Sequence, residues 1–192
     1  MKSTLITLIV LLLSFSLNAQ NFAKKGVIEM GGSAGFSSIT SVFNGESAEN
    51  STSVFMIEPY VGYFIMNGLE LGLIPSFSTY SHGDASQTSF GVYFAPAYNF
   101  DLKSSLYPFI EGRIGYNTSS YDDGNSLTED ASSSGLAWGL RGGVKVQLGN
   151  SALLNFALAY NQITMNPENW DGDRNGQNSF DVMAGFTVFL GK

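Results

Sequence analysis

Hydrophobic and polar residues alternate with a period of two along most of this chain. In residues 53–65, large apolar side chains share one face of the segment: Phe55, Ile57, Val61, Tyr63 and Ile65. The opposite face carries a mixed set with a charge and a glycine: Met56, Glu58, Tyr60 and Gly62. Residues 69–80 repeat the pattern. This period is typical of β-strands whose two faces have different surroundings.

Eight segments share the alternation, and we expect a strand in each: residues 26–37, 53–65, 69–80, 88–100, 106–118, 136–148, 152–161 and 179–190. Each is close to the length, about 9–11 residues, with which a tilted strand crosses a bilayer. Short connections (66–68, 101–105, 149–151) alternate with long polar ones (38–52, 119–135, 162–178), and 81–87 is intermediate. Outer-membrane barrels have such periplasmic turns and extracellular loops. The pattern therefore predicts an all-β fold, an eight-stranded antiparallel transmembrane β-barrel.

A soluble barrel such as a lipocalin also has alternating strands, but its polar face must cover the exterior. Here the polar face is rich in glycine and sparse in charge: Gly31, Gly35, Gly62, Gly72, Gly91, Gly115, Gly139, Gly143 and Gly185. The other face carries large rings: Phe90, Phe94, Tyr98, Tyr116, Trp138, Phe156, Tyr160, Phe180 and Phe186. Because such rings suit lipid and its interfaces, we expect them on the outside.

Three prolines fall within expected strands. Pro59, Pro75 and Pro96 each remove a hydrogen-bond donor from the ladder, and a closed barrel has no edge strand to absorb the loss. We therefore predict β-bulges at these positions.

Several stretches have the character of a known family: PYVGYFIMNGLELG, FGVYFAPAYNF, YPFIEGRIGYN and the terminal GFTVFLGK. On these stretches, residues 26–192 resemble the small eight-stranded outer-membrane barrels of the porin-like class, related to OmpX and to the membrane half of OmpA. The resemblance implies that the barrel-assembly machinery reads the last strand, where Gly185, Val188 and Leu190 match the family's signal. Gly191 and Lys192 follow where the family usually ends on an aromatic residue.

The first residues have the features of a secretory signal peptide. Lys2 precedes an apolar run from Leu5 to Leu17, and Ala19 is a suitable cleavage position. We expect residues 1–19 to be removed, and residues 20–192 to form one barrel domain in the outer membrane of a Gram-negative cell envelope. The chain has no cysteine, which excludes disulfides and a lipid-modified cysteine anchor.

Composition narrows the classes of partner. Charged residues make up only 13% of the chain, about half the share in soluble proteins, so much of the surface avoids water. The net charge of −7 argues against nucleic acid as a partner, because phosphate binding needs clustered Lys and Arg.

Charged residues at inward-facing positions define the candidate functional site, a polar network in the lumen. The network comprises Glu29, Glu58, Glu70, Glu111, Arg113, Arg141, Lys145 and Asp181. Counting from the turns places Glu58, Arg113, Arg141 and Asp181 near mid-height, and a symmetric loop 119–135 would put Arg113 opposite Arg141. Because an eight-stranded barrel leaves room only for side chains, we expect these residues to plug the lumen. The alternative is that they line a wet pore.

Two loops carry residue types found at chemical sites. Asp171, Asp173, Asn175 and Gly176 have the spacing of a calcium loop's first half, but Val182 stands where a bidentate acid is needed, and Asp181 comes one residue early. His82, the only histidine, lies near Ser81 and Asp84, which raises a lipid A-modifying enzyme as an alternative. We predict no catalytic residue, metal or cofactor, and interpret both segments as solvated loops.

The expected function is a structural or interaction role in the envelope. Acids dominate the expected extracellular loops: Glu46, Glu49, Asp84, Asp122, Asp123, Glu129, Asp130, Glu168, Asp171 and Asp173, against one base, Arg174. They either keep the loops soluble or contact lipopolysaccharide through divalent cations, or a basic partner. We expect a monomer embedded in outer-membrane lipid. A small-solute pore is the alternative from another class.

Overall fold

The computed structural model describes residues 22–82, 85–122, 131–165 and 173–191; the expected signal peptide, residues 1–19, lies outside them. Nine strands are present in the described residues: β1 (Ile28–Phe43), β2 (Glu46–Ser47), β3 (Thr52–Met66), β4 (Leu69–His82), β5 (Ala85–Asn99), β6 (Leu106–Asp122), β7 (Ala131–Leu148), β8 (Ala152–Thr164) and β9 (Gly176–Leu190). Across the described part of the chain, no helix is both long and apolar enough to cross a membrane.

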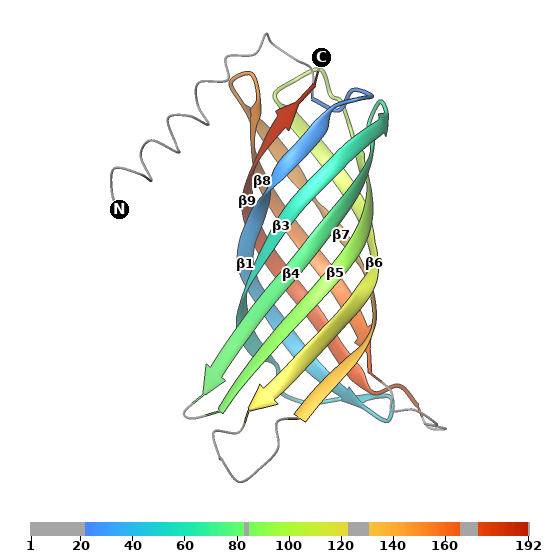
Figure 1. The fold of residues 1–192 in the computed structure, drawn as a ribbon, viewed down its shortest axis with the longest axis vertical. Helices are drawn as coiled ribbons and strands as arrows, with labels where there is room; N and C mark the ends of the chain where they lie inside the picture. Colours follow the sequence, from blue (N-terminus) through green and yellow to red (C-terminus); the bar gives the residue numbers. More distant parts are fainter. Residues whose placement is uncertain (1–21, 83–84, 123–130, 166–172, 192) are drawn as a thin grey trace, which may run out of the picture.

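Eight of these strands form a closed barrel. β1 pairs with β3, each strand from β3 onward pairs antiparallel with the next, and β9 closes on β1 from Ile28↔Leu190 to Val42↔Gly176. The two-residue β2 extends only the end of β1. Figure 1 shows the strands running obliquely around one barrel. The predicted eight-stranded antiparallel barrel is confirmed.

The two ends of the barrel differ. Tight connections after β3, β5 and β7 lie at the end where the described chain begins and ends, at the top of Figure 1. We call this the turn end, formed by residues 67–68, 100–105 and 149–151. The opposite end, where β1, β4, β6 and β8 finish, is the loop end.

The strands extend further toward the loop end than the sequence pattern predicted. β1 continues to Phe43, β6 to Asp122 and β8 to Thr164, and β7 begins at Ala131, so part of each expected long loop is strand. The added residues are mostly polar on both faces, because hydrophobic alternation is needed only where one face meets lipid. The hydrophobic alternation therefore stops before the strands end on the side of the loop end.

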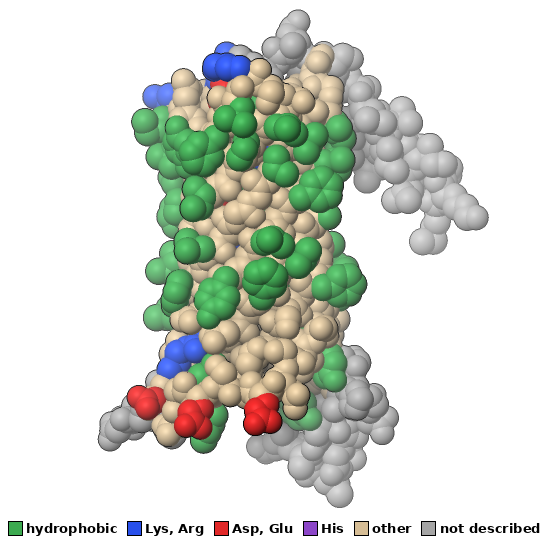
Figure 2. Space-filling view, turned by 180° about the vertical axis from the view of Figure 1, so that it is seen from behind, with side chains coloured by type: hydrophobic (Ala, Val, Ile, Leu, Met, Phe, Trp, Pro, Cys, Tyr) green, Lys and Arg blue, Asp and Glu red, His purple; other side chains and the backbone are tan. Residues whose placement is uncertain are grey.

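The two faces of the wall are as predicted. All nine rings expected outside have exposed fractions between 41% and 53%. Figure 2 shows apolar side chains spread over the visible wall, with the charged side chains gathered toward the two ends. The inward positions of β3 are buried, including Glu58 and Tyr60. The hydrophobic surface is thus on the outside, as a lipid environment requires.

The prediction of bulges at the three prolines is wrong. β3 and β4 pair as Ile57↔Phe77 on one side of Pro59 and Pro75 and as Val61↔Leu73 on the other, so both strands advance equally. The β5–β6 register is likewise unchanged across Pro96. The β3–β4 register shifts instead at Phe64/Met66, beside the turn. The flanking pairs hold the register, and each proline remains paired on its other side, as Gly32↔Pro59, Pro75↔Val92 and Leu71↔Pro96.

Candidate functional site

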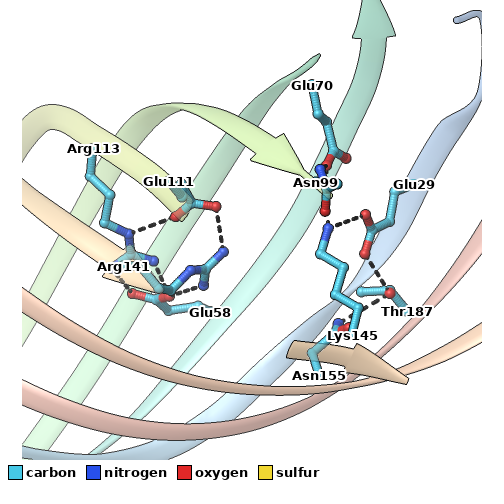
Figure 3. A network of polar contacts seen from close by, with 10 residues as sticks. All are labelled: Glu29, Glu58, Glu70, Asn99, Glu111, Arg113, Arg141, Lys145, Asn155 and Thr187. Carbon is cyan, nitrogen blue, oxygen red and sulfur yellow. Dashed lines mark hydrogen bonds and ion pairs between the residues drawn. The ribbon is translucent and has the colours of Figure 1, made fainter. Parts of the chain in front are cut away.

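Seven of the eight charged residues predicted for the lumen are brought together in two groups (Figure 3). One group, nearer to the turn end, contains Lys145; the other contains Arg113 and Arg141. All seven are at most 8% exposed, as is Asp181, which lies apart from both groups. Since buried ions are stable only when paired and hydrogen-bonded, the contacts within each group decide what it does.

Two arginines and two glutamates form what we call the Arg–Glu quartet: Glu58 on β3, Glu111 and Arg113 on β6, and Arg141 on β7. The Arg113 guanidinium forms a two-pronged pair with Glu58 and donates from Nε to Glu111 at 3.1 Å. Arg141 donates to Glu111 at 2.6 Å and to Glu58 at 3.3 Å. Each arginine thus contacts both carboxylates, and the four formal charges cancel.

A symmetric β6–β7 connection would put Arg113 almost opposite Arg141, but the observed register differs from the symmetric one by two residues. Arg141 pairs with Glu111 across β6 and β7, while Arg113 pairs with Gly139. The β6–β7 connection is therefore not symmetric about the centre that the sequence suggested. The offset of two residues places opposite charges side by side, which removes the repulsion between like charges expected from the symmetric register.

Lys145 lies at the centre of the second group, the Lys145 group, with Glu29, Glu70, Asn99, Asn155 and Thr187. Its ammonium donates to Glu29 at 2.5 Å and to Glu70 at 3.2 Å. Thr187 and Asn99 donate to the same two carboxylates at 2.6 and 3.1 Å. The aromatic rings of Phe22, Tyr60 and Phe109 surround the ammonium, with centroids 5.0–5.6 Å away. Such rings attract a cation through their negative faces.

Inward glycines make room for this group. Gly62 and Gly72 pair directly across β3 and β4, and a Cβ on Gly62 would overlap the Glu70 carboxylate and the Tyr60 hydroxyl. A Cβ on Gly72 would lie 2.7 Å from the Tyr60 ring. The glycine-rich inner face, which indicated a lumen in the sequence, therefore gives space to the long side chains that fill it.

A short segment before β1 closes the turn end. Phe22 is 1% exposed and packs against Phe64, Tyr107 and Phe189 with ring centroids 5.0–5.3 Å apart. Backbone hydrogen bonds of 2.8 Å tie this segment to the β3–β4 hairpin, from Gly26 to Phe64 and from Gly68 to Ala23. We call residues 22–27 the N-terminal cap. The cap places a hydrophobic layer between the Lys145 group and the turn end of the barrel.

Asp181, the eighth residue of the predicted network, forms no hydrogen bond or ion pair with the quartet, although the charges of Glu58 and Arg113 act on its carboxylate. Its carboxylate accepts hydrogen bonds from Ser37 and Asn161, both at 2.6 Å, and no described lysine or arginine forms an ion pair with it. Asp181 is 0% exposed. It borders a cavity of about 40 Å³ whose lining also includes Glu58 of the quartet. A second cavity, of about 10 Å³, lies between the quartet and the Lys145 group.

No contact among the described residues supports the calcium-loop or the histidine candidate as a chemical site. Asp171 lies outside the described residues, and Gly176, instead of making a loop turn, begins β9 and pairs with Thr164. The Asn175 side-chain oxygen accepts the backbone N–H of Asn44 at 2.8 Å, which fixes the β1–β2 turn. Asp84 also lies outside the described residues, and the side-chain surroundings of His82 are likewise not described.

Sequence reasoning missed the neutral partners of the charged groups. Asn99, Asn155, Asn161 and Thr187 all occupy inward positions, and parity alone would have identified them. Phe22 lies before the alternation begins, so no periodic signal marked it.

The chain matches the family described as outer membrane protein beta-barrel domain over residues 7–191. The protein therefore belongs to this family of outer-membrane β-barrel proteins and is placed in the outer membrane.

Solved structures show the same fold. Neisserial surface protein A is similar with a TM-score of 0.65 and 19% identity, covering 85% of this chain and 99% of its own. The N-terminal β-barrel domain of Pseudomonas aeruginosa OprF has a TM-score of 0.56 and 12% identity, covering 86% and 98%. OprG from Pseudomonas aeruginosa has a TM-score of 0.51 and 17% identity, covering 88% and 98%. A search of curated proteins found no significant match.

Proposed function

We propose that this protein is a non-conducting barrel that holds acidic extracellular loops at the cell surface, with a structural or interaction role in the envelope. The observation that supports the proposal is the set of buried, ion-paired side chains inside the barrel. The quartet, the Lys145 group and the N-terminal cap lie in succession along the interior, with the Phe22 ring of the cap 5.0 Å from the Lys145 ammonium. The two cavities beside the quartet, about 40 and 10 Å³, have room for about three water molecules and one.

The buried pairs also favour a permanent plug over a weakly held one. Arg113 and Glu58 are each no more than 4% exposed, and their contact is two-pronged. Breaking such a pair by moving one partner leaves a buried charge, which costs about 3–5 kcal/mol. Thermal motion alone rarely supplies this free energy, so the lumen stays closed.

Planar-bilayer recording tests the closed lumen directly. The purified wild type is expected to give no steady single-channel openings, while Arg141→Ala, which removes one side of the quartet, is expected to leak. Lys103→Ala is a matched control, because Lys103 lies in an exposed turn where it pairs only with Asp101. Frequent, steady openings of the wild type would support the small-solute pore instead.

The proposed contacts outside the cell rest on the charge of the loops. Their acids suit divalent-cation bridges to anionic lipopolysaccharide, or a basic partner. A deletion strain should therefore change in adhesion or surface binding, with permeability and lipid A composition unchanged. Altered permeability would indicate a pore, and altered lipid A acylation would indicate a lipid-modifying enzyme.

The proposed biogenesis follows the features of the chain's two ends. Export would remove residues 1–19, and the barrel-assembly machinery would insert β9 and its neighbours as a monomer. Amino-terminal sequencing of the mature protein should begin near Gln20. A mature protein that retains Lys2 would contradict cleavage.

A further inference from the structure

The lumen contains more acid than base. Five buried carboxylates face it, from Glu29, Glu58, Glu70, Glu111 and Asp181, against three cations, from Arg113, Arg141 and Lys145. The quartet is neutral, so the excess lies with the Lys145 group and with Asp181. In the Lys145 group the two carboxylates share one ammonium. Asp181 has no such partner.

Among the described residues, no lysine or arginine forms an ion pair with Asp181. The chain has nine Lys and Arg residues, and the loop segments 83–84, 123–130 and 166–172 contain none of them. Arg174, the one base near the loop end, donates to the backbone oxygens of Ile163 and Gln177 at 2.7 and 2.8 Å and to the Thr164 hydroxyl. Asp181 is therefore a buried carboxylate that accepts hydrogen bonds from neutral donors, while Arg113 acts on its charge only from beyond ion-pair distance.

The space beside Asp181 suits a small cation. The cavity of about 40 Å³ is lined by oxygen-bearing side chains, among them Ser37, Asn161, Ser179 and Asp181. The Asn161 side-chain nitrogen donates to Asp181 and to Ser179, whereas its oxygen, which has no hydrogen-bond partner, lies beside Gly139. A buried carboxylate without an ion pair costs free energy, which a cation beside Asp181 would recover. The cavity has room for an ion with one or two waters.

The approach to the cavity comes from the loop end. Gln177 and Ser179 line the cavity on the side of the loop end, and both are half-buried. The quartet lies on the opposite side of the cavity. The three long loops expected at this end, residues 38–52, 119–135 and 162–178, contain nine acids and one base. An acidic rim raises the local concentration of cations.

We propose that this cavity is a binding site for a monovalent metal cation of sodium or potassium size, neutralising Asp181 from the extracellular side. Glu58, the other carboxylate of the lining, is already paired with Arg113 and Arg141, so Asp181 with its neutral hydroxyl and amide neighbours matches a single positive charge. Calcium sites combine several carboxylate and carbonyl ligands, and the described residues contain no group of three or more His, Cys, Asp or Glu that could hold a metal ion.

Amide NMR of the wild-type protein in detergent micelles tests the site without any substitution. Sodium chloride is titrated against N-methylglucamine chloride at constant ionic strength, because that organic cation is too large for the cavity. Saturable shifts in sodium at Ser37, Asn161, Ser179 and Asp181, absent in N-methylglucamine, are expected. Shifts that do not saturate, occur in both salts, or spread evenly around the loop end would overturn the proposal. So would saturation by calcium at a lower concentration than by sodium.

Thermal unfolding of variants supplies a second readout. The wild type should melt at a higher temperature in sodium than in N-methylglucamine chloride, because a ligand that binds the folded state stabilises it. Asp181→Asn should lose this difference, whereas Asp101→Asn, at an exposed turn-end pair, should keep it. A difference retained in Asp181→Asn would refute the site. If Asp181→Asn does not fold, the wild-type titration alone decides. Neither readout depends on whether the lumen conducts.

Discussion

Replacing Arg141 by alanine should lower the free energy of unfolding by about 3 kcal/mol, at the lower end of the range for breaking a buried ion pair. Arg141 donates to Glu111 at 2.6 Å and to Glu58 at 3.3 Å, and its loss leaves both carboxylates buried. The cost is at the lower end because Arg113 still contacts both acids. The Arg141 Nε atom also has no hydrogen-bond partner, so the residue is not fully satisfied.

The same reasoning predicts a larger loss of stability when the other arginine, Arg113, is replaced. Arg113→Ala removes the two-pronged contact with Glu58 and the contact with Glu111, so its cost should approach the upper end, about 5 kcal/mol. Combining Arg141→Ala with Glu111→Gln removes one uncompensated charge. The double variant should therefore be less destabilised than the sum of the single variants, by about 0.5–3 kcal/mol.

Equilibrium unfolding in urea, with the protein folded in lipid vesicles, measures each cost. Lys103→Ala is the control, because its pair with Asp101 is exposed and should contribute little. A cost for Arg141→Ala below about 1 kcal/mol, or a cost larger than that of Arg113→Ala, would refute the assignment of the quartet as a buried, mutually dependent plug.

Three further substitutions test the cap, the lumen packing and the lipid-facing wall. Phe22→Ala should cost about 3 kcal/mol in urea unfolding, because it empties the centre of an aromatic cluster at the turn end; a near-neutral effect would mean that the cap is not seated. Gly62→Val should abolish the heat-modifiable folded band on detergent gels, whereas Gly112→Ala, whose added Cβ would meet nothing within 4 Å, should keep it. Leu140, which is 57% exposed, is expected to face lipid at mid-bilayer, so Leu140→Arg should lower the free energy of unfolding by about 2–4 kcal/mol. Tyr121→Arg, near the loop end, should lower it by only about 0–1 kcal/mol. Equal small costs for the two variants would mean that the outer surface faces water.

The alternation of residue types determined the architecture. In β3, Phe55 and Ile57 point outward and Glu58 inward, as the period of two required, and the same parity placed Arg113, Arg141 and Lys145 in the lumen. This succeeds because strand geometry alone fixes the face of every residue once a segment is extended. Charge content and ring placement then decided that the apolar face lies outside.

Only the tertiary structure decided which inward residues meet. The β6–β7 register, which no periodic signal in the intervening sequence specifies, pairs Arg141 with Glu111 instead of Arg113. Contacts across the lumen, such as Lys145 with Glu29, join strands remote in sequence, and parity does not specify their heights. Phe22 reaches the turn end by packing outside any regular element. Asp181 shares the parity of the quartet, yet the height of β9 leaves it beside a cavity, with Ser37 and Asn161 as its partners.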